Sequence, residues 1–184
     1  MITTYHISDA PLTEVKTWLR NNAHGKHFEN YKNIEFNNNY LAISVERDIN
    51  KQITCFSSVY KNNFYPDKCV RIFNRWLATR KIGGTKEQIL SDRAIQIATQ
   101  QIYFAEMMGY ESFFVSYHSY IPKFCNRLVD LLNQKTEWHW RHAELVKVTP
   151  SNKKSSYQHI IYCGKDLEEF INTSIDLKDW RSLC

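Results

Sequence analysis

The stretch that decides the fold is Val70–His118, which divides into consecutive segments of different character. It reads VRIFNRWLAT (residues 70–79), RKIGGTKEQILS (80–91), DRAIQIATQQIYFAEMMGY (92–110) and ESFFVSYH (111–118). These segments predict an apolar strand, a basic loop with adjacent glycines, a long helix and a second apolar strand. Such a loop offers backbone N–H groups beside the positive end of a helix dipole, which is a common way to bind a phosphate.

The composition is that of a globular protein. The chain has 184 residues, of which 43% are hydrophobic, and a formal net charge of +5. This length predicts one domain, residues 1–184, because it allows a sizeable core and is short for two. The basic residues are scattered, whereas a nucleic-acid-binding surface is usually denser. We therefore expect a mild preference for anionic ligands, and nucleic acid is an alternative that is not favoured.

The sequence predicts a cytoplasmic protein without a membrane partner. No segment approaches the roughly 18 apolar residues of a membrane span, and the N-terminus lacks a signal-peptide core. Asn, Lys, Ile and Tyr are abundant, which is typical of AT-rich genomes; a viral origin is one alternative, with the host cytoplasm as location. An odd number of cysteines without a close pair predicts buried reduced thiols; they are Cys55, Cys69, Cys125, Cys163 and Cys184.

The N-terminal part predicts one helix and an antiparallel meander. Ser8 or Asp9 is the expected N-cap of a helix that begins near Pro11, because both side chains can accept hydrogen bonds from first-turn N–H groups. Asp48–Lys51 has the composition of a hairpin turn. Short connections between successive strands favour antiparallel pairing; the predicted strands are Thr3–Ile7, Tyr40–Arg47, Gln52–Tyr60 and Cys69–Thr79.

The remaining chain predicts helices that alternate with strands. Ser91 or Asp92 is the best cap for a helix over Arg93–Met108, which Gly109 ends; alternatively, the helix begins earlier, through Lys86–Leu90. Further elements are a central strand Glu111–Tyr117, a helix Pro122–Asn133, a hairpin of Glu137–Thr149 with Tyr157–Cys163, and a last helix within Lys165–Trp180. The predicted fold class is α/β (α+β), with helices flanking a mixed, mostly antiparallel sheet.

Two groups of aromatic and histidine residues admit more than one interpretation. Trp138 and Trp140 alternate with His and Arg, as in a strand that stacks bases, but packing against a helix is the favoured interpretation. His24 and His27 are spaced like metal ligands without an acidic or cysteine partner nearby. No metal site is predicted.

The order of elements resembles the GCN5-related N-acetyltransferases, a superfamily of acetyl-CoA-dependent acyltransferases. After the fourth strand, the family pattern is Arg or Gln, two residues, Gly, one residue, then Gly or Ala. Arg80 and Gly83 match this pattern, Gly84 fills the free position, and Thr85 stands where Gly or Ala is expected, so a divergent member is implied. The resemblance implies that acetyl-CoA, or another acyl-CoA, binds at the loop formed by Arg80, Lys81, Ile82, Gly83, Gly84 and Thr85.

The residues of this loop suit a pyrophosphate independently of the resemblance. Gly83 and Gly84 leave backbone N–H groups accessible, and Arg80 and Lys81 add positive charge. The alternative is a basic turn that merely reverses the chain. The order of residues fits neither a Walker loop nor a dinucleotide fingerprint.

The resemblance also implies where transfer chemistry would occur. The fourth strand would lie beside the acyl-pantetheine arm, and an amine would attack the thioester carbonyl, which requires a base and an acid. Tyr120, after the fifth strand, is the first choice for the acid, with Tyr117 and His118 beside it. Glu46 is the candidate base, and a solvated hairpin carboxylate is the alternative for it.

Asn74 and Arg75 form a polar pair inside an otherwise apolar strand, which is costly unless the pair lines a cleft or is paired. Strand alternation sends the two side chains to opposite faces unless a bulge intervenes. Arg75 could hold an anionic acceptor with its guanidinium fork, and Asn74 and Tyr117 could contact the acceptor. The alternative for Arg75 is that it covers aromatic surface.

The function predicted from these observations is acyl-CoA-dependent transfer of an acetyl or similar acyl group to a small-molecule or macromolecular amine. The alternative is a non-enzymatic nucleic-acid- or protein-binding accessory module on the same fold. The oligomeric state is left open, with a homodimer among the alternatives.

Overall fold

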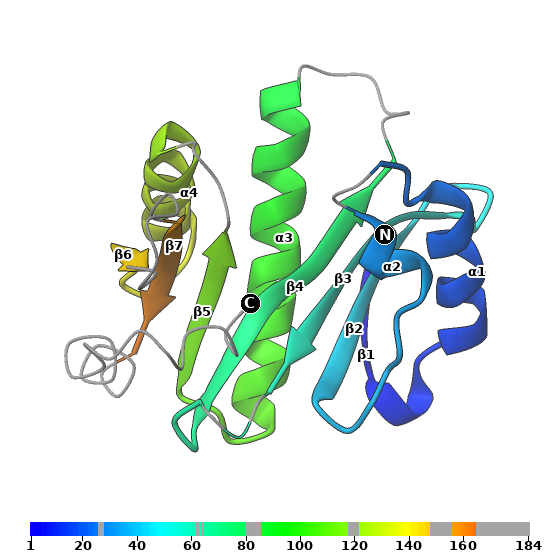
Figure 1. Ribbon diagram of the computed structural model, residues 1–184, viewed down its shortest axis with the longest axis horizontal. Coiled ribbons are helices and arrows are strands. Elements are labelled where there is room, and N and C mark those ends of the chain that lie inside the picture. The colour runs from blue at the N-terminus through cyan, green and yellow to red at the C-terminus, as the bar shows by residue number, and fades with distance from the viewer. Residues whose placement is uncertain are drawn as a thin grey trace. The chain divides into compact units, whose positions relative to one another are not determined.

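The computed structural model describes residues 1–25, 28–61, 63, 65–79, 86–117, 122–147 and 156–164. Within these residues, seven strands form one mixed sheet in the order β1-β2-β3-β4-β5-β7-β6 (Figure 1). The strands are β1 (Ile2–His6), β2 (Tyr40–Arg47), β3 (Ile53–Tyr60), β4 (Cys69–Ala78), β5 (Ser112–Tyr117), β6 (Arg141–Lys147) and β7 (Ser156–Cys163). The helices are α1 (Leu12–Asn22), α2 (Glu29–Lys32), α3 (Lys86–Met107) and α4 (Pro122–Lys135), with a short 3-10 helix at Ile7–Asp9. The predicted fold class, a mixed sheet flanked by helices, is confirmed.

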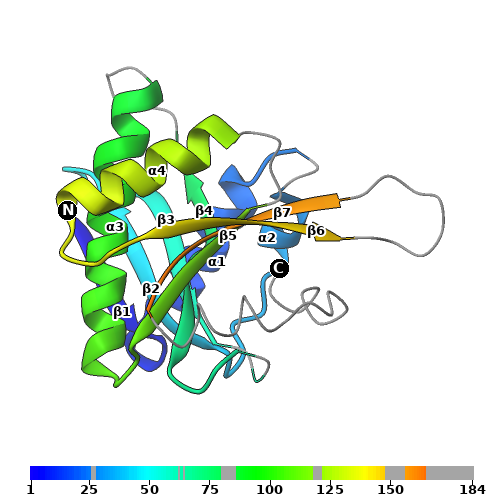
Figure 2. The same cartoon turned by 90° about the vertical axis from the view of Figure 1, so that its left-hand side faces the viewer.

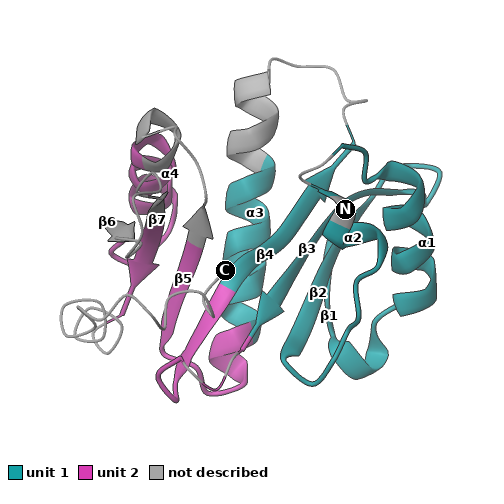
Figure 3. Cartoon of the chain, viewed as in Figure 1, with its two compact units in different colours: residues 1–60, 72–104 teal, residues 61–71, 105–184 magenta. Residues whose placement is uncertain are grey.

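The contacts of the chain divide it into two compact units (Figure 3). Unit 1 comprises Met1–Tyr60 and Ile72–Phe104, and unit 2 comprises Lys61–Arg71 and Ala105–Cys184. Strand β4 and helix α3 contribute residues to both units. Each unit is described by itself below, and the expectation of one domain stays a prediction.

The core of unit 1 follows from the alternation of β2. Ile43 and Val45 point to the face that α1 covers, and Ser44 between them points to the other face, because successive strand residues alternate. The ladders β1–β2 and β2–β3 are both antiparallel, as predicted. Burying each large aliphatic side chain contributes about 1.5–3 kcal/mol. The buried members of this core cluster are Val15, Leu19, Ala23, Ile34, Tyr40, Ile43, Val45, Ile53, Phe56 and Leu77.

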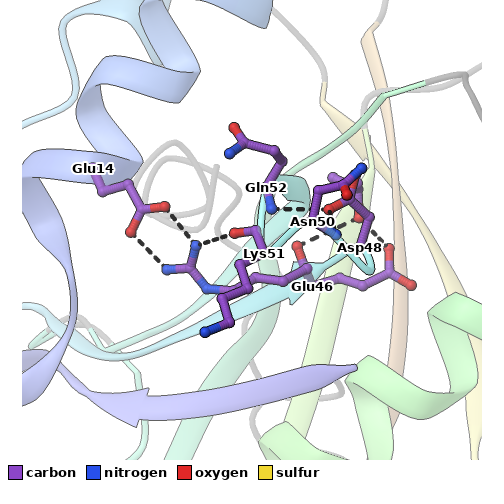
Figure 4. A network of polar contacts seen from close by, with 8 residues as sticks. Glu14, Glu46, Asp48, Asn50, Lys51 and Gln52 are labelled. Carbon is purple, nitrogen blue, oxygen red and sulfur yellow. Dashed lines mark hydrogen bonds and ion pairs between the residues drawn. The ribbon is translucent and has the colours of Figure 1, made fainter.

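The predicted hairpin turn at Asp48–Lys51 is present and is tied to α1 (Figure 4). The Asp48 carboxylate accepts hydrogen bonds from the backbone N–H groups of Asn50 and Gln52, both at 2.9 Å. Arg47 donates to the Glu14 carboxylate, at 2.6 Å for Nη2, and to the Lys51 carbonyl at 2.9 Å. The Arg47 guanidinium holds the pKa of Glu14 below its usual range. Exposed pairs of this kind contribute at most about 1 kcal/mol, so the turn itself sets the register.

Both predicted helix caps were wrong. Ser8 and Asp9 lie in the 3-10 helix Ile7–Asp9, and α1 begins at Leu12 after an N-cap, Pro11, that forms no side-chain hydrogen bond. Helix α3 begins at Lys86, so the predicted caps Ser91 and Asp92 lie inside it. The alternative of a longer helix is therefore the correct one. Lys, Glu, Gln and Leu in residues 86–90 are good helix formers, which explains why the helix starts before the polar pair.

In unit 2, β5 is a central strand, as predicted. It pairs in parallel with β4 over Cys69–Arg71 and antiparallel with β7, which also pairs with β6 (Figure 2). Its residues Phe113, Phe114 and Val115 are each only 1% exposed. Such a fully apolar strand is expected where both faces are covered.

Trp138 and Trp140 pack within unit 2, which confirms the favoured interpretation. Trp140 is 1% exposed, and its indole N–H donates to Thr136 at 3.2 Å. The indole of Trp138 donates to Glu106 at 3.0 Å and meets the ring of Phe113 edge-on. The strand predicted from Glu137 begins only at Arg141, because the Asn133 side chain binds both backbone groups of Trp140 at the end of α4.

Cys55, Cys69 and Cys163 are free and buried, as predicted for them. Cys184, the side chain of Cys125 and the predicted last helix lie outside the described residues. None of the described helices combines the length and the apolar character that crossing a membrane requires.

Candidate active site

The centre of β4 departs from strand geometry. Phe73 and Arg75 have φ angles of 54° and 55°, in the left-handed region that side chains other than glycine rarely adopt. Each such residue costs roughly 1–2 kcal/mol. Regular alternation is interrupted here, because the rings of Phe73 and Trp76, which alternation would place on opposite faces, stack with their centres 5.4 Å apart. The irregular backbone therefore lies at Asn74 and Arg75, where a bulge was the expected exception to alternation, and the bulge itself stays a prediction.

Gln101 of α3 holds this irregular segment from the core of unit 1. The side chain is 0% exposed; its Oε1 accepts a hydrogen bond from the backbone N–H of Phe73 at 2.9 Å, and its Nε2 donates to Ser44 at 3.0 Å. The Ser44 hydroxyl lies 2.9 Å from that of Thr4. A buried amide with partners on both of its polar atoms rigidifies its surroundings, whereas an unpaired one is costly.

Gln101 was not among the predicted site residues, although the sequence contains a signal for it. It lies three residues after Ala98 and four before Ala105, which puts it on the same helix face as these apolar residues. A polar residue on that face requires a buried partner. Only the fold identifies that partner as a backbone group of β4.

Asn74 is 6% exposed and is bound to Ser58 of β3. The Ser58 hydroxyl donates to the Asn74 carbonyl at 2.7 Å, and the Asn74 amide donates to the Ser58 oxygen at 3.1 Å. These bonds offset the cost of burying the amide. They give Asn74 a structural function in the irregular segment Phe73–Arg75 of β4, which we call the kink. The role of Asn74 in acceptor binding stays a prediction.

Arg75 lies over an aromatic surface. Its Nη1 donates to the Asn30 carbonyl at 3.2 Å, and its guanidinium carbon is 5.7 Å from the centre of the Tyr31 ring. Burial raises the pKa of the neighbouring Tyr40 phenol, although Arg75 opposes this shift, so Tyr40 is a neutral hydroxyl near pH 7. The interpretation of Arg75 as a cover for aromatic surface is confirmed. Binding of an anionic acceptor stays a prediction.

Glu46 is engaged in an ion pair with Arg93 of α3. Its carboxylate accepts hydrogen bonds from Arg93 Nε at 3.1 Å and from the Thr54 hydroxyl at 2.8 Å, and it lies 2.8 Å from Arg93 Nη2 in an ion pair. The side chains are 16% and 8% exposed, so the alternative of a solvated hairpin carboxylate was wrong. The pair connects β2, β3 and α3. A general base needs an accessible lone pair within reach of the proton that it removes. The role of Glu46 as a base stays a prediction.

The remaining predicted site residues lie outside the described part of the chain. These are His118, Tyr120, the side chain of Tyr117, and the loop Arg80, Lys81, Ile82, Gly83, Gly84 and Thr85. What the structure does describe is the start of α3 at Lys86, directly after the glycine loop. The N-terminus of a long helix thus follows residues 80–85 in the sequence, and the anion site at these residues stays a prediction.

Metal ligands were not predicted, and the described side chains contain no cluster of three or more His, Cys, Asp or Glu residues suited to a metal ion. Of the histidines spaced like ligands, His24 is exposed and His27 is outside the described residues.

Comparison with known proteins adds information on the fold. No family model and no curated protein matches this chain. Among solved structures, a probable acetyltransferase from Staphylococcus epidermidis matches 90% of this chain and 100% of its own, with a TM-score of 0.58 and 7% identity. An N-acetyltransferase from Staphylococcus aureus matches 88% and 97%, with a TM-score of 0.56 and 12% identity. The ribosomal-protein-S18-alanine N-acetyltransferase from Escherichia coli matches 88% and 92%, with a TM-score of 0.53 and 12% identity. At these identities the similarity shows the fold alone.

Proposed function

We propose that this chain, whose fold is that of the GCN5-related N-acetyltransferases, transfers an acyl group from an acyl-CoA to an amine. The observation that carries the proposal is the irregular backbone at Phe73–Arg75, where two residues of β4 adopt positive φ, in the strand that the resemblance assigns to the acyl group. A kink in a strand releases backbone N–H groups from the ladder. Strained backbone that is held by its surroundings is typical of functional sites.

The kink limits which backbone groups can orient the acyl carbonyl. The N–H of Phe73 is bound to Gln101 and the carbonyl of Asn74 is bound to Ser58. We therefore assign the carbonyl contact to the N–H groups of Asn74 and Arg75. Preorganised donors of this kind stabilise the charge that develops on the oxygen during acyl transfer.

The coenzyme is assigned to the loop of residues 80–85. Gly83 and Gly84, with the first turn of α3 after them, would bind the pyrophosphate, and Arg80 and Lys81 would add charge. An acyl-CoA would supply an activated thioester. The amine nitrogen forms the new C–N bond as the C–S bond breaks, a base takes the ammonium proton, and an acid protonates the leaving thiolate.

The acid is assigned to Tyr120, with His118 beside it in the sequence. A phenol can protonate a thiolate, and a tyrosine after a strand end lies where the chain leaves the sheet. For the base, Glu46 is the residue that we predict from the sequence, although both of its carboxylate oxygens are in contact with Arg93 or Thr54. A water molecule relaying the proton to a further group is the alternative.

Titration calorimetry with acetyl-CoA tests the proposal. Gly83→Leu should abolish measurable acetyl-CoA binding, because a side chain at this position would occupy the space that we assign to the pyrophosphate. Acetyl-pantetheine, which lacks the pyrophosphate, is the matched control ligand, and its affinity should not change. Thermal unfolding without ligand shows whether the variant is folded. Failure of the wild-type protein to bind acetyl-CoA at millimolar concentration would overturn the proposal.

A further inference from the structure

We propose that the amine acceptor carries an anionic oxyacid group, a carboxylate or a phosphonate, and that Arg75 binds this group. The inference deepens the proposed acyl transfer and rests on it. It concerns the cluster of Asn30, Tyr31, Tyr40 and Arg75, all within unit 1. The cluster has three properties that together indicate an anion site: a cation with neutral partners, a fixed orientation and a strained backbone.

The first property is the chemistry of the partners of Arg75. They are the Asn30 carbonyl, the Tyr31 ring and the Tyr40 phenol, and none of these is charged near pH 7. The ion pairs among the described residues include Lys16–Glu35, Arg47–Glu14, Lys68–Glu111 and Arg93–Glu46. Arg75 is in none of them. Its guanidinium therefore retains the capacity to bind an oxyacid through two parallel hydrogen bonds.

The second property is the orientation of the guanidinium. The Asn30 carbonyl holds one end at 3.2 Å, and the Tyr31 ring lies at 5.7 Å from the guanidinium carbon. A side chain fixed in this way loses little further conformational entropy when a ligand binds. Stacking on an aromatic ring leaves the edge of the guanidinium plane, which carries the N–H groups, available to a ligand.

The third property is the backbone of Arg75. Its φ of 55° lies in the left-handed region, in the interior of a strand. Arginine has no local hydrogen bond that favours this conformation, unlike asparagine or aspartate. The conformation turns the side chain toward Tyr31 and Tyr40, on the segment whose N–H groups we assign to the acyl carbonyl. An anion bound to Arg75 would thus be anchored beside the reacting amine, which raises the effective concentration of that amine.

Paired acceptors provide the test. Each pair consists of an amino acid and the amine that remains without its carboxylate: β-alanine with ethylamine, phenylalanine with phenethylamine, and tyrosine with tyramine. Aminoethylphosphonate, also compared with ethylamine, tests the phosphonate. Thiol release from acetyl-CoA gives kcat and KM, and calorimetry without acetyl-CoA gives the affinity for each acceptor.

The variants separate charge from shape. Arg75→Met keeps an unbranched side chain on Tyr31 without the charge, and Arg75→Lys keeps the charge without the fork. Arg20→Met, at an exposed arginine of α1, is the matched control. We expect Arg75→Met to raise KM for the anionic acceptors about tenfold or more, as the loss of a charge-assisted pair predicts. For the amines without the oxyacid group, which are ammonium ions near pH 7, Arg75→Met should raise KM far less, so that the effect is specific to the acceptors that carry this group. Arg20→Met should change KM for neither kind of acceptor, and Arg75→Lys should be intermediate.

The outcomes distinguish this inference from the proposed function. Equal use of both members of every pair, or an equal effect of Arg75→Met on both, would overturn the anion site while acyl transfer stands. Arg75-dependent binding of the anionic members by a protein that does not bind acetyl-CoA would overturn acyl transfer while the anion site stands. No calorimetric binding of any anionic acceptor at millimolar concentration would also overturn the inference.

Discussion

Arg75 adopts its left-handed backbone conformation at a measurable cost in stability. At ordinary strand positions, Gly is less stable than Ala by roughly 0.5–1 kcal/mol. At Arg75 we expect the reverse order, with Arg75→Gly more stable than Arg75→Ala by about 1 kcal/mol, because Gly adopts positive φ without the steric penalty. Urea unfolding measures the difference.

The matched comparison is Arg71, on the same strand but without a positive φ. There, Arg71→Ala should be more stable than Arg71→Gly. If Ala is also preferred at position 75, the backbone of β4 is not strained there, and strain does not contribute to the proposed anion site.

The buried pair of Glu46 and Arg93 is the second residue-scale feature that an experiment can isolate. Arg93→Met removes the cation from a carboxylate that is 16% exposed, and it should cost about 3 kcal/mol of unfolding free energy, as for other buried pairs. The double variant Glu46→Met with Arg93→Met should recover most of this loss. The exposed pair Lys68–Glu111 is the control, where Lys68→Met should cost less than about 1 kcal/mol.

The same variants test the role of Glu46 in transfer. If Glu46 is the base, the double variant is stable but loses acetyl transfer. If Glu46 serves only to connect β2 with α3, the stable double variant retains most of the activity of the wild-type protein.

At the scale of elements, α3 supports the kink of β4 through Gln101. Gln101→Leu leaves the Phe73 N–H and the Ser44 hydroxyl without this partner, which should cost about 1–3 kcal/mol for each buried group that stays unsatisfied. Because the kink positions the proposed carbonyl contact, kcat should fall as well. Gln96→Leu makes the same substitution at an exposed position of α3 and should change neither quantity. Loss of stability without loss of kcat would mean that Gln101 does not position the site.

Most of the strands could be predicted because their signal is local. Tyr40–Arg47 was predicted with its observed bounds, and in the structure Ile43 and Val45 lie on one face of β2 and Ser44 on the other. The start of α3 could not be decided from caps, because Ser91 and Asp92 are tolerated inside a helix whose preceding residues are good helix formers.

At the scale of the whole molecule, two buried thiols make stability depend on pH. Burial raises the pKa of Cys55 and of Cys163 from 9.0 to about 12. As pH rises, the unfolded chain loses these protons before the folded chain does. The stabilisation of the folded state by the buried, protonated thiols is therefore complete below about pH 9 and is lost as pH rises toward 12. Each thiol should contribute a slope of about 1.4 kcal/mol per pH unit in this window.

The measurement is urea unfolding as a function of pH for the wild-type protein and for Cys163→Ala. The variant should show a smaller alkaline slope, while the slope below pH 8 or so should be the same in both. Burial also raises the pKa of Tyr40 and Tyr110, which act in the same direction, so only the difference between the two proteins reports on the thiol. Equal slopes would contradict the burial of a protonated Cys163.

The sequence by itself determined the order of helices and strands, the central position of Phe113–Val115 and the packing of Trp140. Each of these depends on apolar periodicity, which residues close together in the chain encode. The tertiary structure alone decided the kink at Phe73–Arg75, the contacts of Gln101 and the ion pair between Glu46 and Arg93. Gln101 is 28 residues from Phe73 and 57 from Ser44, and Arg93 is 47 residues from Glu46. Such contacts form only when the sheet brings distant segments together, so local sequence patterns do not predict them.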